Sequence, residues 1–109
     1  MDIITPKELQ KKITSKDQFL LLDVRDPFEK YQSNIEANHY QNIQADQLET
    51  HLDEIEAEKD DEIICVCRAG GRCTGAHELL VQSGYTKVKT LKGGINNWSK
   101  EVDNSLPIY

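Results

Sequence analysis

Residues 63–73 read Ile63-Ile64-Cys65-Val66-Cys67-Arg68-Ala69-Gly70-Gly71-Arg72-Cys73. A short apolar run here meets a pair of glycines and then a helical pattern, which predicts a strand, a tight loop and a helix N-terminus. Cys67 would leave the strand where the next four residues can curl around its sulfur. Glycine lets backbone N–H groups approach closely and adopt unusual dihedral angles. The stretch therefore predicts an anion-binding loop with a cysteine at its centre.

The sulfur of Cys67 is the candidate nucleophile. A thiolate is the reactive form of cysteine, and inward-pointing amides, a helix N-terminus and nearby arginines all favour it. A helix terminus contributes about 0.3–1 kcal/mol, or ~2 kcal/mol when partly buried, which lowers the pKa of a thiol by about one unit. The loop amides and Arg72 must supply the rest, and we then expect Cys67 to be substantially ionised at neutral pH. The competing interpretation is a buried structural cysteine beside a tight turn.

Three motifs resemble one known family. The run Cys67–Arg72 resembles the six-residue active loop of rhodanese-type sulfurtransferases, in which the cysteine takes up sulfane sulfur as a persulfide. Leu21-Leu22-Asp23-Val24-Arg25, followed by Glu29, is similar to the family's first-strand signature. Leu91–Trp98 resembles its closing L-x-G-G-x-x-x-W motif. The C-terminal segment 101–109 looks like the tail of rhodanese domains fused to enzymes that activate ubiquitin-like sulfur carriers.

The resemblance implies a rhodanese-like α/β fold, with a central parallel sheet of about five strands and helices on both faces. The alternation of strand and helix patterns independently favours such a sheet. We expect residues 1–109 to form a single rhodanese domain. Further elements are predicted as a helix from Pro6 to about Ile13, a buried strand Phe19–Val24, a short helix from Pro27 to about Tyr31, an amphipathic helix from Asp46 to about Ala57, a strand Lys87–Leu91 and a final helix through Trp98.

The resemblance also assigns roles to site residues. Cys67 and Arg72 are the expected catalytic residues, with Arg72 bracing the loop or the persulfide charge. The persulfide-binding loop comprises Arg68, Ala69, Gly70 and Gly71, and Arg68 is expected to face solvent and meet an anionic donor. Asp23 and Arg25 are expected to support the loop: Asp23 ends a buried strand, at the sheet edge where sites gather, and Arg25 should pair with a nearby acid.

The connection 33–43 departs from the family. Rhodaneses usually have Gly-His-Ile-Pro-Gly-Ala here, whereas this chain has Ser33-Asn34-Ile35-Glu36-Ala37-Asn38. Only Ile35 fits the pattern. The loss of a glycine and a proline leaves the conformation of this connection, and of one wall of the site, open.

Composition narrows the class of protein. The 109 residues carry a net charge of −6, which argues against nucleic acid as a partner. No apolar run approaches the ~20 residues of a membrane span, and no signal peptide is visible. An odd count of three cysteines fits a reducing compartment, so we expect a cytoplasmic protein. We also expect it to be a monomer. The spacing Cys65-x-Cys67-x5-Cys73 lacks a fourth ligand at a usual offset, so neither a metal nor a cofactor is expected.

The expected activity is ping-pong transfer of sulfane sulfur on Cys67, from thiosulfate or a protein persulfide to a thiol, cyanide or a ubiquitin-like sulfur carrier. A cysteine phosphatase or arsenate reductase is a weaker alternative, because those families place five residues between cysteine and arginine and this chain has four. The other alternative is a non-catalytic partner-binding or redox-sensing module. There Cys73 would be a candidate resolving thiol, although it can equally be a packing thiol. Cys65 is expected to be inert core.

Overall fold

A five-stranded parallel sheet organises the computed structural model, which describes residues 2–109. Met1, where the expected domain begins, lies outside the described residues. The strands are β1 (Ile3–Ile4), β2 (Leu20–Asp23), β3 (Tyr40–Asn42), β4 (Glu62–Val66) and β5 (Lys87–Leu91). Their spatial order is β1-β5-β4-β2-β3, and every neighbouring pair is parallel. The predicted α/β fold with about five parallel strands is confirmed.

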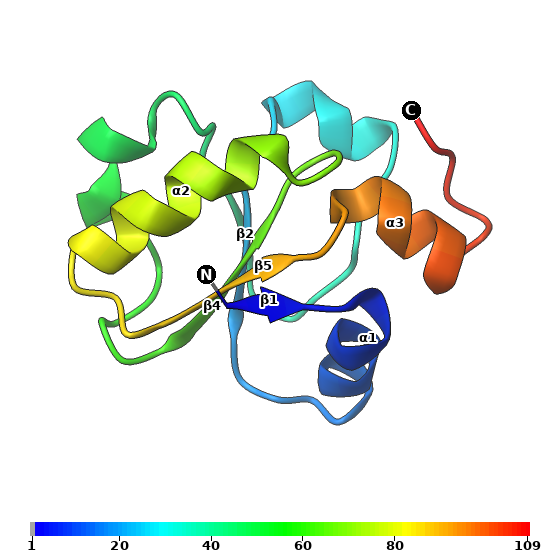
Figure 1. The fold of residues 1–109 in the computed structure, drawn as a ribbon, viewed down its shortest axis with the longest axis horizontal. Helices are drawn as coiled ribbons and strands as arrows, with labels where there is room; N and C mark the ends of the chain where they lie inside the picture. The colour runs from blue at the N-terminus through cyan, green and yellow to red at the C-terminus, as the bar shows by residue number, and fades with distance from the viewer. Residues whose placement is uncertain (1) are drawn as a thin grey trace.

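Helices cover both faces of the sheet (Figure 1). Helix α2 (Gly71–Gln82) lies on one face, and α1 (Pro6–Thr14) and α3 (Gly94–Glu101) lie together on the other. The connection after β2 forms the 3-10 helix η1 (Pro27–Tyr31). Helix α1 starts where the sequence predicts, because Thr5 and Glu8 form a reciprocal capping box around its first turn.

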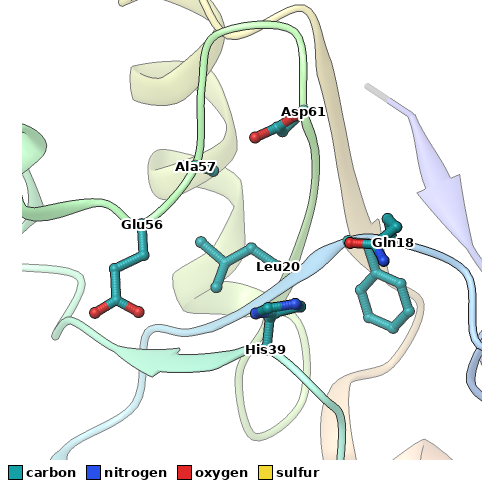
Figure 2. Close-up of a pocket in the computed structure, with 7 residues that line it drawn as sticks. Gln18, Leu20, His39, Glu56, Ala57 and Asp61 are labelled. Atoms are coloured by element: carbon teal, nitrogen blue, oxygen red, sulfur yellow. The ribbon is translucent and has the colours of Figure 1, made fainter.

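A cavity of about 160 Å³ opens at the edge of the sheet where the strands begin (Figure 2). It is bounded by Leu20 at the start of β2, by His39 just before β3 and by Asp61 just before β4. Sites in parallel α/β sheets gather at the opposite edge, beyond the carboxyl ends of the strands. Cys67, which directly follows β4, lies at that opposite edge.

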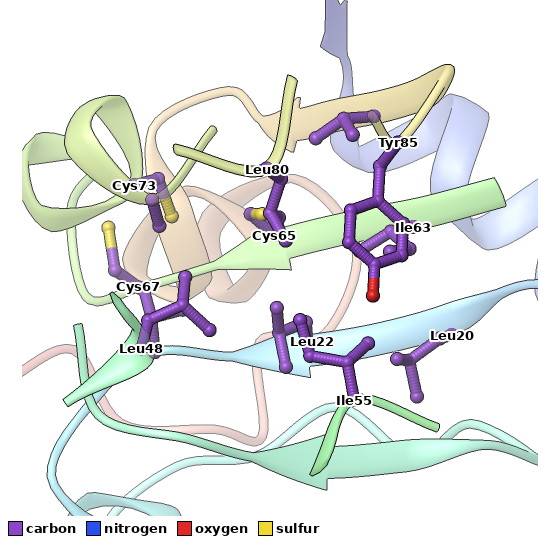
Figure 3. Close-up of a cluster of buried hydrophobic side chains, with 13 residues drawn as sticks. Leu20, Leu22, Leu48, Ile55, Ile63, Cys65, Cys67, Cys73, Leu80 and Tyr85 are labelled. Carbon is purple, nitrogen blue, oxygen red and sulfur yellow. The ribbon is translucent and has the colours of Figure 1, made fainter. Parts of the chain in front are cut away.

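Two apolar clusters sandwich the central strands. Side chains alternate between the faces of a strand, so β2 and β4 contribute to both clusters. The cluster under α2 is shown in Figure 3 and contains Leu20, Leu22, Ile63, Cys65, Cys67, Cys73 and Leu80. The cluster under α1 and α3 contains Leu9, Leu21, Ile64, Val66, Ile95 and Trp98. Burial on both faces explains why β2 and β4 read as continuous apolar runs in the sequence.

The predicted amphipathic helix from Asp46 to Ala57 is wrong. The segment instead forms two 3-10 helices, η2 (Leu48–Thr50) and η3 (Leu52–Glu54), and the chain is already extended at Ile55. The side chain of Gln41 on β3 occupies backbone groups of this segment that a helix would use. Its amide nitrogen donates to the Glu54 carbonyl at 2.6 Å, and its oxygen accepts from the Glu56 amide at 2.9 Å. These bonds to the sheet replace the continuation of a helix.

The register of the sheet places Asp23 beside the reactive loop. Asp23 pairs with Val66, the residue before Cys67, and with Asn42 on the other side. The connection 33–43, which the sequence left open, buries Ile35 in the cluster under α1 and α3. It does not form the expected wall of the site, because none of its residues lines the cleft at Cys67. Its Ser33 is buried as well, and the Ser33 carbonyl accepts a hydrogen bond from Arg25.

Candidate active site

The turn between β4 and α2 wraps around the sulfur of Cys67. Gly70 adopts a φ of 106°, in the left-handed region that glycine enters without steric cost. The Gly70 N–H donates to Cys67 Sγ at 3.0 Å, and the left-handed φ turns the chain from this contact into the following helix. Helix α2 begins immediately afterwards, at Gly71. The predicted strand, loop and helix N-terminus are confirmed.

Cys73, in the first turn of α2, is the strongest influence on Cys67. The neighbouring Cys73 side chain is the main cause that lowers the pKa of Cys67, to about 6. Burial opposes this shift, and the backbone amides of Cys73, Gly70 and Arg72 add to it. The same contact with Cys67 raises the pKa of Cys73, as does its burial, so Cys73 remains a thiol that can donate. Figure 3 shows the two side chains near each other on the same face of the sheet.

This arrangement adds a function for Cys73 that the sequence did not suggest. The Cys73 thiol, one turn along the helix, lowers the pKa of the candidate nucleophile, in addition to packing under α2. Its use as a resolving thiol for an oxidised Cys67 stays a prediction. Cys65 is fully buried, and burial raises its pKa to about 12, as expected for an inert core thiol.

Arg72 is tied to Glu29 on η1. Its guanidinium donates two bonds to that carboxylate, Nη1 to Oε2 at 2.7 Å and Nη2 to Oε1 at 2.9 Å. The Arg72 side chain thereby lowers the pKa of Glu29 to about 2, against the effect of burial. Such bidentate pairs fix geometry as well as charge. Of the two roles predicted for Arg72, bracing the loop is the one that these contacts support.

Asp23 and Arg25 form a buried ion pair beside the loop. Arg25 has no exposed surface, and its Nη2 donates to Asp23 Oδ2 at 2.7 Å while its Nε donates to Oδ1 at 2.8 Å. The hydroxyl of Tyr40 on β3 donates to the same carboxylate at 2.6 Å. The Ser33 carbonyl accepts from Arg25 Nη1 at 2.8 Å. The predicted pairing of Arg25 with a nearby acid is confirmed, and the pair ties the ends of β2 and β3 to the connection 33–43.

Two further residues join the site that sequence reasoning did not assign to it. Glu29 was noted only as part of a motif and of a helix start, yet it links η1 to Arg72. Tyr109 was noted only as part of a tail, yet its hydroxyl accepts from Arg25 Nη1 at 2.8 Å and donates to Glu29 Oε1 at 2.9 Å. The capping pattern at Asp26 was a local signal for Glu29. Nothing in the local sequence signals the contact of Tyr109.

An open cleft of about 550 Å³ leads to Cys67. One wall comes from η1 and the residue before it, a second from the loop after β4, and the third from Tyr109. Arg68 is exposed on the loop, as predicted, and its guanidinium lies 5.2 Å from the centre of the Tyr109 ring. The cleft therefore combines a solvent-facing cation with a cysteine sulfur that accepts a hydrogen bond from a backbone amide.

Comparison with known proteins agrees with this geometry. Residues 5–101 match the model of the Rhodanese-like domain. This chain belongs to the rhodanese-like family. A sulfurtransferase from Allochromatium vinosum is 34% identical over 108 residues, which cover 96% of this chain and 92% of that protein. A rhodanese-related protein from Thermoplasma volcanium has a solved structure that matches with a TM-score of 0.79 at 29% identity, covering 100% of this chain and 98% of the other.

Longer relatives contain a similar rhodanese domain as one part. The adenylyltransferase and sulfurtransferase UBA4 of Candida albicans is 34% identical over 113 residues, which cover 97% of this chain and 25% of that protein. The chain thus spans about a quarter of the length of such relatives. Their similarity to this rhodanese domain agrees with the resemblance noted for the tail.

The first residues of α3 bind the backbone of the loop around Cys67. The amide of Ile95 donates to the Cys67 carbonyl at 2.8 Å, and the amide of Asn96 donates to the Arg68 carbonyl at 3.1 Å. Gly94 lies against the same backbone, and a Cβ built there would be 2.5 Å from both carbonyl oxygens. The closing motif of the family therefore supports the reactive loop through its glycine and through the first amides of α3.

Within residues 2–109, no three histidine, cysteine or acidic side chains come together as a metal site would require. Nor does that part of the chain contain a helix with the length and apolar character needed to cross a membrane.

The pKa of Cys67 leads to a testable prediction. Its alkylation rate by iodoacetamide should rise with pH through a midpoint near 6 and level off above it, because only the thiolate reacts. Cys73→Ala should move the midpoint upward by removing the largest stabilising contact. Cys73→Ser, which keeps a donor, should move it less. Mass spectrometry of the Cys67 peptide provides the measurement, and a wild-type midpoint near the ~8.5 of free cysteine would contradict the geometry.

Proposed function

We propose that this protein is a sulfurtransferase that carries sulfane sulfur as a persulfide on Cys67. The observation that supports this most directly is the loop geometry, with an amide 3.0 Å from the Cys67 sulfur at the floor of an open cleft. Membership of the rhodanese-like family and the sulfurtransferase from A. vinosum support sulfurtransferase activity in general. The donor and acceptor named below are our proposals.

The first half-reaction uses the Cys67 thiolate as a nucleophile. With thiosulfate as donor, the thiolate attacks the outer sulfur, a new S–S bond forms, and the bond to the sulfonate sulfur breaks. Its electron pair leaves with sulfite, and the enzyme keeps Cys67–S–S⁻. A thiolate acceptor then attacks the terminal sulfur, takes it as its own persulfide and restores the Cys67 thiolate. Both steps conserve charge and need neither proton nor external oxidant. The covalent persulfide intermediate makes the mechanism ping-pong.

The loop stabilises the negative sulfur throughout this cycle. Backbone donors that point toward developing charge need no rearrangement during the reaction, which is the principle of an oxyanion hole. The amides of Gly70, Arg72 and Cys73 already act on the resting thiolate. We assign Ala69 and Gly71 to the same loop wall, and Arg68 to the approach of an anionic donor.

Protein partners are the second part of the proposal. The similarity to UBA4 and to the two MOCS3 relatives of Zea mays suggests that a protein sulfur carrier is the acceptor. A wide cleft suits such an acceptor better than a closed cavity would, because the tail of another chain can enter it. The donor would then be thiosulfate or the persulfide of another protein.

The proposal is tested by intact-mass spectrometry after incubation with thiosulfate. The wild type should gain the mass of one sulfur atom, and the gain should disappear on treatment with cyanide or a thiol. Cys67→Ser should gain nothing. Cys65→Ser is the matched control: it removes the buried thiol two residues away and should still gain one sulfur.

Equal labelling of the wild type and Cys67→Ser would reject Cys67 as the carrier. Absence of labelling in the wild type, together with turnover of a phosphate ester, would favour a phosphatase instead.

A further inference from the structure

The hydroxyl of Tyr109 lies between the two ion pairs of the site. It accepts from Arg25 at 2.8 Å and donates to Glu29 at 2.9 Å, so it connects the Asp23–Arg25 pair with the Glu29–Arg72 pair. One end of this chain of contacts is buried beside β2, and the other reaches the loop around Cys67. Arg25 also reaches Glu29 directly, but only at the Glu29 backbone carbonyl, which accepts from Arg25 Nη1 at 3.4 Å. Within residues 2–109, the Tyr109 hydroxyl is the side-chain group that links Arg25 to the Glu29 carboxylate.

The main chain and the ring of Tyr109 are fixed as well. The Asn96 side chain accepts from the Tyr109 amide at 3.2 Å and donates to its carbonyl at 3.3 Å. The amide of Asn96 itself binds the Arg68 carbonyl at 3.1 Å. The Tyr109 ring lies 5.2 Å from the Arg68 guanidinium, within the range of a cation–π contact. Tyr109 is thus anchored to the helix that supports the loop, and it contacts a loop side chain.

We propose that Tyr109 is a positioning residue for sulfur transfer. Its hydroxyl orients Glu29 and, through Glu29, the Arg72 end of the loop, while its ring orients Arg68 at the mouth of the cleft. This inference rests on the proposed function of Cys67. It extends that function to a residue 80 positions away from Glu29 in the sequence.

The two parts of the side chain should affect different steps. Without the hydroxyl, Glu29 keeps its bonds to Arg72 and to the Asp26 amide, and Arg25 keeps its bond to the Ser33 carbonyl. The fold should therefore persist, while the carboxylate gains freedom to tilt and the loop loses its fixed geometry. Without the ring, Arg68 loses the surface that holds it over the cleft, and an anionic donor should bind less well.

The test is single-turnover persulfide formation with thiosulfate, followed by mass spectrometry at several thiosulfate concentrations. Tyr109→Phe should lower the limiting rate constant about tenfold and leave the half-saturating concentration within about twofold, because misplaced reacting groups lose rate rather than binding. Tyr109→Leu should also raise the half-saturating concentration about two- to fivefold, through loss of the ring contact. Tyr31→Phe is the matched control: Tyr31 is 83% exposed, and its variant should match the wild type.

A double-mutant cycle separates positioning from a general structural role. If Tyr109 acts through Glu29, adding Tyr109→Phe to Glu29→Gln should slow the reaction by less than about twofold. Independent, multiplicative losses would overturn the inference, as would a Tyr109→Phe variant with the wild-type rate constant. A fall in melting temperature with both kinetic constants unchanged would also overturn it. If Tyr109→Leu does not fold, Tyr109→Phe and the double-mutant cycle still test whether Tyr109 is a positioning residue.

Failure of this inference is distinguishable from failure of the proposed function. If the wild type forms no persulfide on Cys67, the function itself is rejected. If the wild type forms it and Tyr109→Phe forms it equally fast, only the positioning role is rejected.

Discussion

Gly94→Ala is expected to destabilise the protein by about 2–6 kcal/mol and to abolish persulfide formation. Gly94 has a φ of 65°, which costs a residue with a Cβ free energy. The new methyl group would also lie 2.5 Å from the carbonyl oxygens of Cys67 and Arg68. Backbone atoms cannot turn aside as a side chain can, so the loop or α3 must move. Denaturant unfolding and the mass assay with thiosulfate measure the two effects.

Gly75→Ala is the matched control for this prediction. Gly75 lies within α2, and a Cβ added there meets no atom within 4 Å. Alanine should stabilise the helix by about 0.5–1 kcal/mol and leave persulfide formation unchanged. A Gly94→Ala variant as stable and active as Gly75→Ala would show that the loop does not depend on close contact with α3.

Asp23→Ala is expected to cost about 3–5 kcal/mol of unfolding free energy, because it leaves the fully buried Arg25 guanidinium without its counter-charge. The Tyr40 hydroxyl and the Arg25 backbone amide lose their acceptor in the same substitution. The Asp23→Ala variant should also lose persulfide formation, because Asp23 lies beside the loop around Cys67. Urea unfolding of the wild type and the variant measures the difference in unfolding free energy, provided that the two curves have comparable slopes.

Two variants make this second prediction specific. Asp60→Ala removes an exposed carboxylate before β4 and should change stability by no more than about 0.5 kcal/mol. The pair Asp23→Leu and Arg25→Met removes both charges, and it should recover part of the stability lost by Asp23→Ala. A cost of Asp23→Ala close to that of Asp60→Ala would mean that the buried pair is not needed to hold the fold.

Most of the fold and the centre of the site could be predicted from local sequence patterns. The continuous apolar runs of β2 and β4, the capping pattern before α1 and the glycines after Cys67 each act on their own neighbours, so they could be interpreted without the rest of the chain. The helix predicted for residues 46–57 was wrong because a contact from outside the segment changes its structure. Its apolar spacing suits a helix, but Gln41, on a different strand, binds its backbone and prevents one.

The sequence by itself determined that Cys67 follows a buried strand and enters a glycine turn, because apolar periodicity and glycine dihedrals are local properties. Tertiary structure alone decided what surrounds that sulfur: the Cys73 thiol turned toward it, Glu29 paired with Arg72, and Tyr109 placed between two ion pairs. Burial and long-range hydrogen bonds depend on which distant segments pack together. For that reason the final residue of this chain and a carboxylate on η1 could be assigned to one site only from their coordinates.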